Sequence, residues 1–352
     1  MNRTRPKRIL ILYTELAGYT VASIQALHAI NTEVSLVRFP VNAEAPFDFS
    51  FDGKLKVYNR QDFNESELIK LAVDVQPDVI LCSGWNDKAY LAVCKEWFGR
   101  IPVVLAMDNK WKGGPKQQLA RLVAGFTIQK TFSHCWVPGS QQKEYALKLG
   151  FTESKVKTGF YTCDTPHFAA IYNGHRTGKE NILPHNFIYA GRYYEFKGVK
   201  ELWEAFVKFK SETTNDWNLI CLGNGDIEPV QHESIRHLGF VQPDQLAEVM
   251  KGAGVFILPS RFEPWAVAVQ EFAVAGFPVL LSREVGAADA FLEEGKNGFS
   301  FQANNVDSIV EAFKRTVALS DDQLNDMGRR SHELGMKNTP ERWANTLLSF
   351  IN

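Results

Sequence analysis

The sequence predicts an α/β protein built from two doubly wound domains, and two observations support this prediction. Short apolar runs alternate with helical patterns from the start of the chain, and a second series of the same kind begins at Phe187. Alternating strands and helices form parallel sheets that are covered on both faces, and their buried strands are continuously apolar. The chain has 352 residues, enough for two domains that each bury a core. We therefore expect two parallel sheets with helices on both faces.

The first domain is expected over residues 1–165. Its helical patterns include Val21–Ile30 and Glu65–Val75. The expected strands are Ile9–Leu12, Val34–Arg38, Val79–Leu81, Val103–Ala106 and Cys135–Val137. The basic residues at the start of the chain lead into only four apolar residues, a run too short for the core of a signal peptide. We interpret that run as the first strand.

The second domain is expected over residues 166–335. Its strands are Phe187–Ala190, Leu219–Leu222, Val255–Leu258 and Pro278–Leu281. The preceding segment Thr162–Pro184 lacks clear periodicity and contains proline and glycine, which is typical of a linker, so a central cleft is expected between the domains. A last helix opening at Thr339 is apolar enough to pack outside its own domain. Residues 336–352 are therefore expected to return toward the first domain.

Bulk composition excludes several classes of protein. The net charge of −1 and the pI of about 6.7 lack the basic excess of a nucleic-acid binder. The longest apolar stretches fall far short of the roughly 20 residues that a membrane-spanning helix needs. The five cysteines are odd in number and lack metal-ligand spacing, which indicates a reducing compartment. The composition predicts a cytoplasmic protein without a nucleic-acid partner.

Two glutamates lie in the segment 259–278, between an expected strand and a Gly-Phe-Pro turn. Glu263 is in the loop after Val255–Leu258, and Glu271 is in a helix expected from Ala266 to Ala275. A helix that begins past the carboxyl end of a strand directs its unpaired amides into the crevice where such sheets bind ligands. The two carboxylates are roughly 12 Å apart along the helix axis, about the reach of a nucleotide sugar. Solvation on a surface helix is the alternative, but the apolar neighbours of Glu271 favour a carboxylate with a binding partner.

A basic loop follows the strand Phe187–Ala190. Arg192 and Lys197 fall at the carboxyl end of that strand, where cations would stabilise a diphosphate. Gly191 and Gly198 flank them and allow close approach of the backbone. An ordinary basic connecting loop is the alternative. The position of the loop beside the glutamates favours a diphosphate site.

The order of these motifs resembles glycosyltransferase family 4, the glycosyl transferases group 1. The motifs are Gly191-Arg192 with Lys197-Gly198, then Gly239-Phe240-Val241, then Leu258 to Trp265, then Glu271 to Gly276. The resemblance covers the second half of the chain closely and the first half loosely. It implies the GT-B fold, with two Rossmann-like domains, and retention of the anomeric configuration.

The resemblance also implies roles for individual residues. Arg192 and Lys197 would hold the donor diphosphate, Glu271 the ribose and Glu263 the transferred sugar. The backbone near Phe240 and Val241 would hold the base of the donor nucleotide. The implied donor-binding residues are Gly18, Gly191, Phe240, Val241, Trp265, Ala266 and Glu271. The implied catalytic residues are Arg192, Lys197, Glu263 and Asp108.

The first half departs from the family pattern in two places. A single glycine, Gly18, stands where the family often has a glycine pair near the donor phosphates. After the strand Val103–Ala106 the family often has a histidine near the sugar, whereas this chain has Asp108 as the positional candidate. As an alternative, Asp108 and Asn109 form a turn and cap.

The resemblance implies a hexosyltransferase-like, retaining enzyme that uses a nucleotide-diphosphate sugar. The acceptor would be a saccharide or a lipid-linked group, in cell-surface glycan or polysaccharide biosynthesis. Fixed cations can balance the leaving diphosphate, and we find no Asp-x-Asp motif in an apolar setting, so neither a metal nor another cofactor is expected. A GT-B-like protein that binds a nucleotide sugar without turnover, or acts as a partner subunit, is the alternative. A nicotinamide oxidoreductase is disfavoured because no Gly-x-Gly-x-x-Gly follows the first strand.

The segment Lys110–Lys130 is basic and amphipathic. A helix of this kind can lie on anionic lipid, which would place the protein peripherally on the inner face of the membrane and indicate a lipid-linked acceptor. In the alternative, the basic face is solvated and the apolar face packs within the domain. The sequence leaves both interpretations open.

Overall fold

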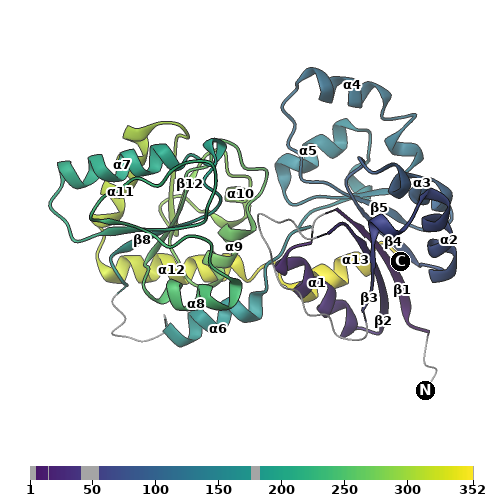
Figure 1. Cartoon of the computed structure of the whole chain (residues 1–352), viewed down its shortest axis with the longest axis horizontal. Helices are drawn as coiled ribbons and strands as arrows, with labels where there is room; N and C mark the ends of the chain where they lie inside the picture. Colours follow the sequence, from purple (N-terminus) through teal and green to yellow (C-terminus); the bar gives the residue numbers. More distant parts are fainter. Residues whose placement is uncertain (1–4, 15, 41–54, 176–182, 352) are drawn as a thin grey trace. The chain divides into compact units, whose positions relative to one another are not determined.

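The computed structural model describes residues 5–14, 16–40, 55–175 and 183–351 (Figure 1). The chain divides into two compact units. Unit 1 contains Met1–Cys163 and Asn338–Asn352, and unit 2 contains Asp164–Lys337. Each unit has one parallel sheet with helices on both faces, which confirms the predicted α/β class with two doubly wound domains. In the described part of the chain, no helix combines the length and hydropathy needed to cross a membrane.

Unit 1 has a seven-stranded parallel sheet in the order β3-β2-β1-β4-β5-β6-β7. The strands are β1 (Lys7–Tyr13), β2 (Thr32–Arg38), β3 (Leu55–Asn59), β4 (Val79–Ser83), β5 (Val103–Ala106), β6 (His134–Trp136) and β7 (Val156–Lys157). The helices are α1 (Gly18–His28), α2 (Glu65–Val75), α3 (Lys88–Trp97), α4 (Pro115–Val123), α5 (Ser140–Lys148) and α13 (Pro340–Leu348), with 3₁₀ turns η1 (Arg60–Asp62), η2 (Ile128–Lys130) and η3 (Glu153–Lys155).

Alternate residues of β1 pack into two separate hydrophobic cores. Ile9 and Ile11 pack into the cluster on one face of the sheet, whereas Leu10 and Leu12 pack into the cluster on the other. Successive side chains of a strand point to opposite faces, so a continuously apolar strand requires helices on both sides. This is why the run Ile9–Leu12 forms a central strand.

Helix α13 belongs to unit 1, where it packs against α1. The Trp343 ring lies 4.9 Å from the Trp136 ring, and its indole Nε1 donates to the Phe160 carbonyl at 2.6 Å. The chain thus leaves unit 1 after Cys163 and re-enters it at Asn338.

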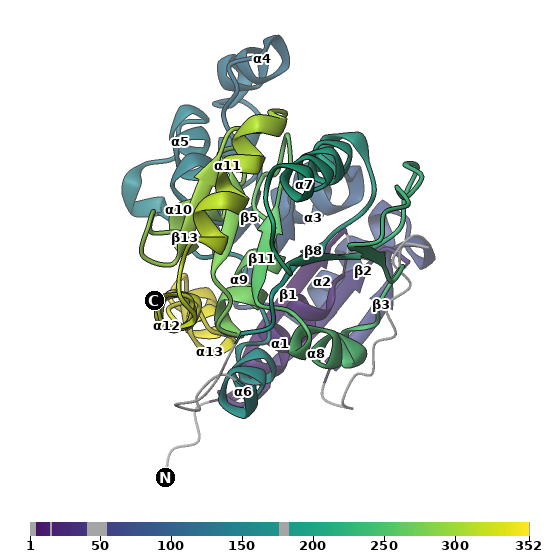
Figure 2. The same ribbon diagram turned by 90° about the vertical axis from the view of Figure 1, so that its left-hand side faces the viewer.

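Unit 2 has a six-stranded parallel sheet in the order β10-β9-β8-β11-β12-β13. The strands are β8 (Asn186–Ala190), β9 (Asn218–Leu222), β10 (Ile235–His237), β11 (Val255–Leu258), β12 (Val279–Ser282) and β13 (Gly298–Phe301). The helices are α6 (Thr165–His175), α7 (Val199–Glu212), α8 (Pro243–Lys251), α9 (Val267–Val274), α10 (Ala288–Phe291), α11 (Val306–Val317) and α12 (Asp321–Gly335), with the 3₁₀ turn η4 (Glu195–Lys197). Helices α7 and α11 pack together on one face, and α6, α8, α9, α10 and α12 group on the other (Figure 2).

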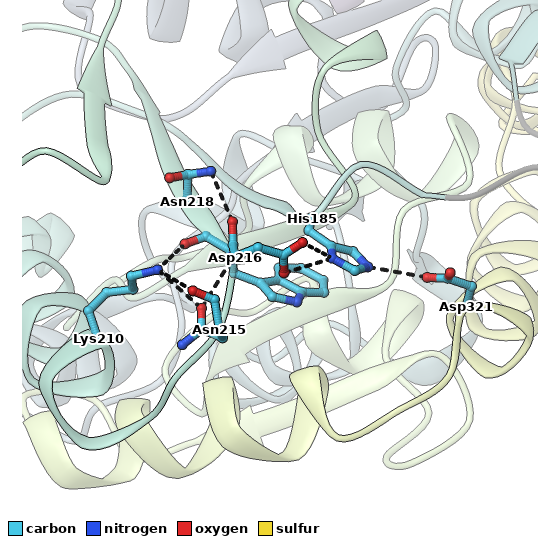
Figure 3. A network of polar contacts seen from close by, with 7 residues as sticks. His185, Lys210, Asn215, Asp216, Asn218 and Asp321 are labelled. Atoms are coloured by element: carbon cyan, nitrogen blue, oxygen red, sulfur yellow. Dashed lines mark hydrogen bonds and ion pairs between the residues drawn. The ribbon is translucent and has the colours of Figure 1, made fainter.

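A polar network closes the amino ends of β8 and β9 (Figure 3). His185 Nδ1 lies 2.9 Å from Asp216 Oδ1, and His185 Nε2 lies 3.3 Å from Asp321 Oδ1 at the start of α12. The ring stacks on Trp217 with 4.9 Å between centroids. Partial burial by itself would lower the pKa of His185, but its hydrogen bonds to Asp216 and Asp321 raise it above its ordinary value. This network holds the start of α12 against the amino ends of the strands. The loops of the candidate site lie at the other end of the sheet, after the carboxyl ends of the strands.

Helix α4 presents its large apolar side chains to solvent. None of its residues is buried, and Leu119, Leu122, Val123 and the following Phe126 are 62%, 77%, 40% and 86% exposed. For these four side chains, the interpretation in which the apolar face of Lys110–Lys130 packs within the domain is wrong. The physical reason is that small residues occupy the inner side of the helix, as described below.

Candidate active site

The loops that follow β8, β9 and β11 in unit 2 contact one another at the carboxyl ends of these strands. Gly191 N donates to the Leu222 carbonyl at 3.0 Å, and Gly223 N donates to the Gly239 carbonyl at 2.7 Å. A Cβ on Gly223, whose φ is +125°, would lie 2.0 Å from the Gly191 carbonyl oxygen, and a Cβ on Gly198 would lie 2.4 Å from the Pro259 oxygen. Glycine is therefore required where the backbones approach closely. Parallel α/β sheets bind ligands at this edge.

Lys197 and Glu263 form an ion pair at this edge. Lys197 Nζ donates to Glu263 Oε2, and Ser260 Oγ donates to the same oxygen at 3.3 Å. Glu263 is only 9% exposed. The structure thus brings together a cation and a carboxylate from separate loops. A buried carboxyl group needs hydrogen-bond partners of this kind to offset its loss of contact with water.

Arg192 lies half-buried in the loop after β8, and that loop is held by its backbone. The Tyr189 hydroxyl donates to the Arg192 carbonyl at 2.9 Å, and Tyr193 N donates to the Asn224 carbonyl at 2.8 Å. A Cβ on Gly191 would lie 2.7 Å from the Tyr189 hydroxyl oxygen. Arg192 is therefore presented from a backbone with little freedom to move.

Arg261 ties the loop after β11 to the turn that carries Lys197. Its amide donates to the Phe196 carbonyl at 2.8 Å, and its guanidinium pairs with Glu195 at 3.0 Å and also with Glu201. Our sequence reasoning did not identify this role. The partners are about 60 residues away in sequence, and spacing alone carries no signal for such a pair.

Strained backbone marks the start of α9. Ala266 has φ +80° and ψ +92°, a conformation that costs a non-glycine residue on the order of 1–3 kcal/mol. The flanking residues hold it in place, because Gly286 N donates to the Glu263 carbonyl and Ala287 N donates to the Trp265 carbonyl, both at 3.0 Å. No described side chain caps the helix. Its first amides are thus directed to the loop edge, where they suit an anion.

The Trp265 side chain lies inside this loop. It is 4% exposed and packs edge-to-face on Phe291, with 6.1 Å between ring centroids. Any direct contact between Trp265 and a nucleotide-sugar donor would therefore involve the backbone of Trp265.

Glu271 lies further along α9, in an apolar stretch of the helix. Burial, aided by the nearby Asp164 carboxylate, raises the pKa of Glu271 from about 4.5 to about 7. A group with this pKa is close to half ionised at neutral pH. Hydrogen-bond donors from a ligand, such as ribose hydroxyls, would favour its charged form.

Phe240 and Val241 follow β10 at the same edge. Gly239 has φ +69°, and its carbonyl receives the hydrogen bond from Gly223 described above. Phe240 is 37% exposed, and Val241 is half-buried. These two residues therefore lie beside the loop after β9.

In unit 1, Asp108 lies among tyrosines. The Tyr161 hydroxyl donates to Asp108 Oδ2 at 3.3 Å, and the Tyr19 ring packs edge-to-face on Tyr161 at 5.6 Å. Burial, with the Tyr19, Asp108 and Tyr13 groups nearby, raises the pKa of Tyr161 well above its usual range. Tyr13 ends β1, so these groups lie at the carboxyl ends of β1 and β5. Our sequence reasoning missed the tyrosines, although the position of Tyr13 at a strand end was a signal that could have found them.

Gly18 is the first residue of α1, and a Cβ there would meet no atom within 4 Å. The structure therefore shows no packing reason for glycine at this position. Among the described residues, no group of three or more His, Cys, Asp or Glu side chains could hold a metal ion.

Comparison with known proteins identifies the class of the fold. Residues 178–333, nearly all of unit 2, match the family model described as "Glycosyl transferases group 1". The structure superposes on that of HepE from Anabaena, solved with UDP and glucose, with a TM-score of 0.69 and 14% identity over 97% of this chain and 98% of that one. The protein thus has the GT-B fold of these glycosyltransferases.

Two curated relatives extend the comparison. An uncharacterized glycosyltransferase of Methanocaldococcus jannaschii is 29% identical over 140 residues, which span 37% of this chain and only 35% of that protein. A glycogen synthase of Mycobacterium tuberculosis is 22% identical over 304 residues, which span 80% of this chain and 72% of that protein. Unit 2 is thus similar in sequence to group 1 glycosyl transferases.

Proposed function

We propose that the protein is a retaining glycosyltransferase of family 4 that moves a hexose from a nucleotide-diphosphate sugar to a saccharide or lipid-linked acceptor. The ion pair of Lys197 and Glu263 beside the first amides of α9 carries this proposal. It supplies a cation for a phosphate and a carboxylate for a sugar hydroxyl at one strand edge. Cell-surface glycan or polysaccharide biosynthesis is the corresponding process. The five buried cysteines support a reducing compartment, the cytoplasm.

Arg192, Lys197 and the amino end of α9 would bind the donor diphosphate. Guanidinium, ammonium and helix amides are the groups that balance phosphate charge in proteins. In this proposal Lys197 shifts from Glu263 to the diphosphate when the donor binds. Glu263 is then released to accept a hydrogen bond from the transferred sugar.

Glu271 would accept hydrogen bonds from the ribose hydroxyls, and the backbone near Phe240 and Val241 would contact the base. The raised pKa of Glu271 supports this role, since a half-buried carboxylate in an apolar helix gains from donors that a ligand provides. Gly18, Gly191, Trp265 and Ala266 complete the proposed donor-binding set.

The proposed reaction breaks the bond between the anomeric carbon and the diphosphate oxygen. The acceptor oxygen attacks the anomeric carbon from the face that the diphosphate leaves, and the acceptor proton passes to the departing phosphate oxygen. The fixed cations stabilise the charge that develops on that oxygen, so neither a metal ion nor a further cofactor is required in this scheme. Asp108 would orient the transferred sugar.

Product analysis and chelation test this proposal. HepE was solved with UDP and glucose, so UDP-sugars are the first donors to screen by thermal shift, followed by guanosine and adenosine diphosphate sugars. We expect turnover to persist in EDTA and proton NMR to show that the product keeps the anomeric configuration of the donor. Strict dependence on magnesium or manganese, or an inverted linkage, would overturn the mechanism. Donor binding without even slow release of nucleotide would indicate a non-catalytic binding protein.

A further inference from the structure

Helix α4 of unit 1 is apolar on its outer side. At 100° per residue, Leu119, Leu122, Val123 and Phe126 follow the spacing i, i+3, i+4 and i+7 that defines one helical stripe. All four are exposed, whereas Ala124 on the opposite side is 1% exposed and Ala120 packs on the core. The usual arrangement, with large apolar side chains directed inward, is reversed. These four residues define the α4 patch.

The protein holds α4 in this orientation through its inner side. Gln117 Oε1 accepts from the amides of Lys112 and Gly113 at 2.7 and 3.0 Å, and Gln117 Nε2 donates to the Lys110 carbonyl at 2.7 Å. The helix is therefore fastened to its own preceding loop. In Figure 1 it lies at the periphery of unit 1, away from the sheet. The exposure of the α4 patch is thus part of the fold.

The segment that carries the α4 patch is positively charged. Between Asp108 and Glu144 the chain contains no acidic residue. Lys112, Lys116, Arg121 and Lys130 are all exposed in this segment, and at 100° per residue Lys116 falls on the same side of α4 as the patch. Lys116, Arg121 and Lys130 make no ion pair with any residue that the structure describes. An exposed apolar stripe in a segment with several cations and no anions complements a surface that offers both acyl chains and negative charge.

We propose that the α4 patch docks the protein on an anionic phospholipid membrane. Leu122 and Phe126 would insert at the boundary between headgroups and acyl chains, while Lys116 and Arg121 contact the lipid phosphates. A second copy of the chain would bury the same apolar area, but it would bring the cations of the two copies together. This inference rests on the proposed function and adds the location of the acceptor, because an enzyme held at the membrane would meet a lipid-linked acceptor.

Vesicle co-sedimentation of the full chain tests the docking. We expect the protein to bind vesicles of phosphatidylcholine mixed with phosphatidylglycerol much more tightly than vesicles of phosphatidylcholine alone, and to dissociate as salt is added. Each basic residue near an anionic surface contributes about fivefold in affinity, so Lys116→Ala with Arg121→Ala should weaken binding by roughly 25-fold. Leu122→Gln with Phe126→Gln should weaken it at least about tenfold.

A matched control comes from α2 in the same unit. Lys70 and Val73 are also exposed there, so Lys70→Ala with Val73→Gln should leave vesicle binding unchanged. Equal binding to both kinds of vesicle, absence of binding, or wild-type binding by both α4 variants would overturn the proposal. A concentration-dependent dimer abolished by Leu122→Gln with Phe126→Gln would also overturn it and assign the patch to self-association. Vesicle binding needs no turnover, so failure of the docking is distinguishable from failure of the proposed activity.

Discussion

The two units share one architecture but carry different chemistry where their strands end. In unit 2, charged groups gather at the carboxyl ends of β8 and β11, among them Lys197, Glu263 and Arg192. In unit 1, the ends of β1 and β5 carry Tyr13 and Asp108, and the Tyr161 hydroxyl donates to Asp108. A doubly wound sheet places side chains at the same edge in both units, and the residue types decide what that edge can bind.

The difference suits two kinds of ligand group. Fixed cations and helix amides in unit 2 match a diphosphate. Phenolic hydroxyls and one carboxylate in unit 1 match hydroxyl groups of a sugar or acceptor, which need both donors and acceptors. We therefore expect variants at the strand edge of unit 2 to change nucleotide binding or turnover, and variants at Asp108 and Tyr161 in unit 1 to change turnover alone.

The largest effect is expected for the cations of unit 2. Arg192→Ala and Lys197→Ala should each lower turnover by about 10²-fold, the scale of losing one charge-stabilising group in a transition state. Steady-state kinetics with a saturating donor measures this loss. Lys200→Ala, an exposed lysine three residues further on, is the matched control and should remain active.

Lys197→Ala also removes the cationic partner of Glu263, so the folding stability of this variant should fall. The double variant Lys197→Ala with Glu263→Gln should recover the melting temperature but not the turnover. Recovery of turnover together with stability would show that Lys197 acts only by supporting the fold. Near-wild-type turnover in the Arg192→Ala variant would remove that residue from the mechanism.

Substitutions of Glu271 and Glu263 should have different effects on ligand binding. Glu271→Ala should weaken the affinity for free nucleoside diphosphate by about tenfold or more, the scale of losing hydrogen bonds to a charged group. Glu263→Ala should impair use of the sugar-bearing donor and leave the free diphosphate affinity much closer to wild type. Isothermal titration calorimetry measures both, and equal losses in the two variants would contradict the assignment of ribose and sugar.

In unit 1, Asp108→Asn should lower turnover by about tenfold, and Tyr161→Phe should lower it by a few-fold. Neither change should alter the affinity for nucleoside diphosphate. A loss of that affinity as large as in Glu271→Ala would remove the functional distinction between the two strand edges.

The pH dependence of stability should report on Glu271. Its folded-state pKa of about 7 lies above the unfolded value, so the ionised form destabilises the fold, and stability is lost as pH rises from about 4.5 through 7. Glu271→Gln should therefore raise the melting temperature at pH 8 by about 3 °C, after allowance for partial exposure, with little effect at pH 4. The same variant should bind nucleoside diphosphate less tightly. A melting temperature that is unchanged at pH 8 would show that the carboxylate is well solvated.

The smallest effect is expected at the opposite end of the unit 2 sheet. The pKa of His185 is raised in the folded state, so its stabilisation is present below its ordinary pKa and is lost as pH rises through the folded value. His185→Gln should lower the melting temperature by about 1 °C at pH 5.5 and by less at pH 8.5. Nucleotide binding should not change, and a change would show that the amino end of the sheet influences the site.

Much of the fold could be predicted from the sequence because buried parallel strands form continuous apolar runs in it. β1, β4, β5, β8 and β11 all coincide with such runs. The predictions missed β3, β7, β10 and β13, because each of these strands is short and lies at the edge of its sheet. An edge strand needs less apolar surface, so its pattern is weak.

The positions of Arg192, Lys197, Glu263 and Glu271 relative to strand ends also followed from the sequence alone, since a loop after a parallel strand must lie at the carboxyl edge. Only the tertiary structure joined Lys197 to Glu263, Tyr161 to Asp108 and Arg261 to Glu201. The amphipathic pattern of α4 likewise indicated a stripe but not the side that faces solvent. Local patterns determine which elements form. Contacts between distant residues depend on how those elements pack, and the spacing of residues along the chain does not predict that packing.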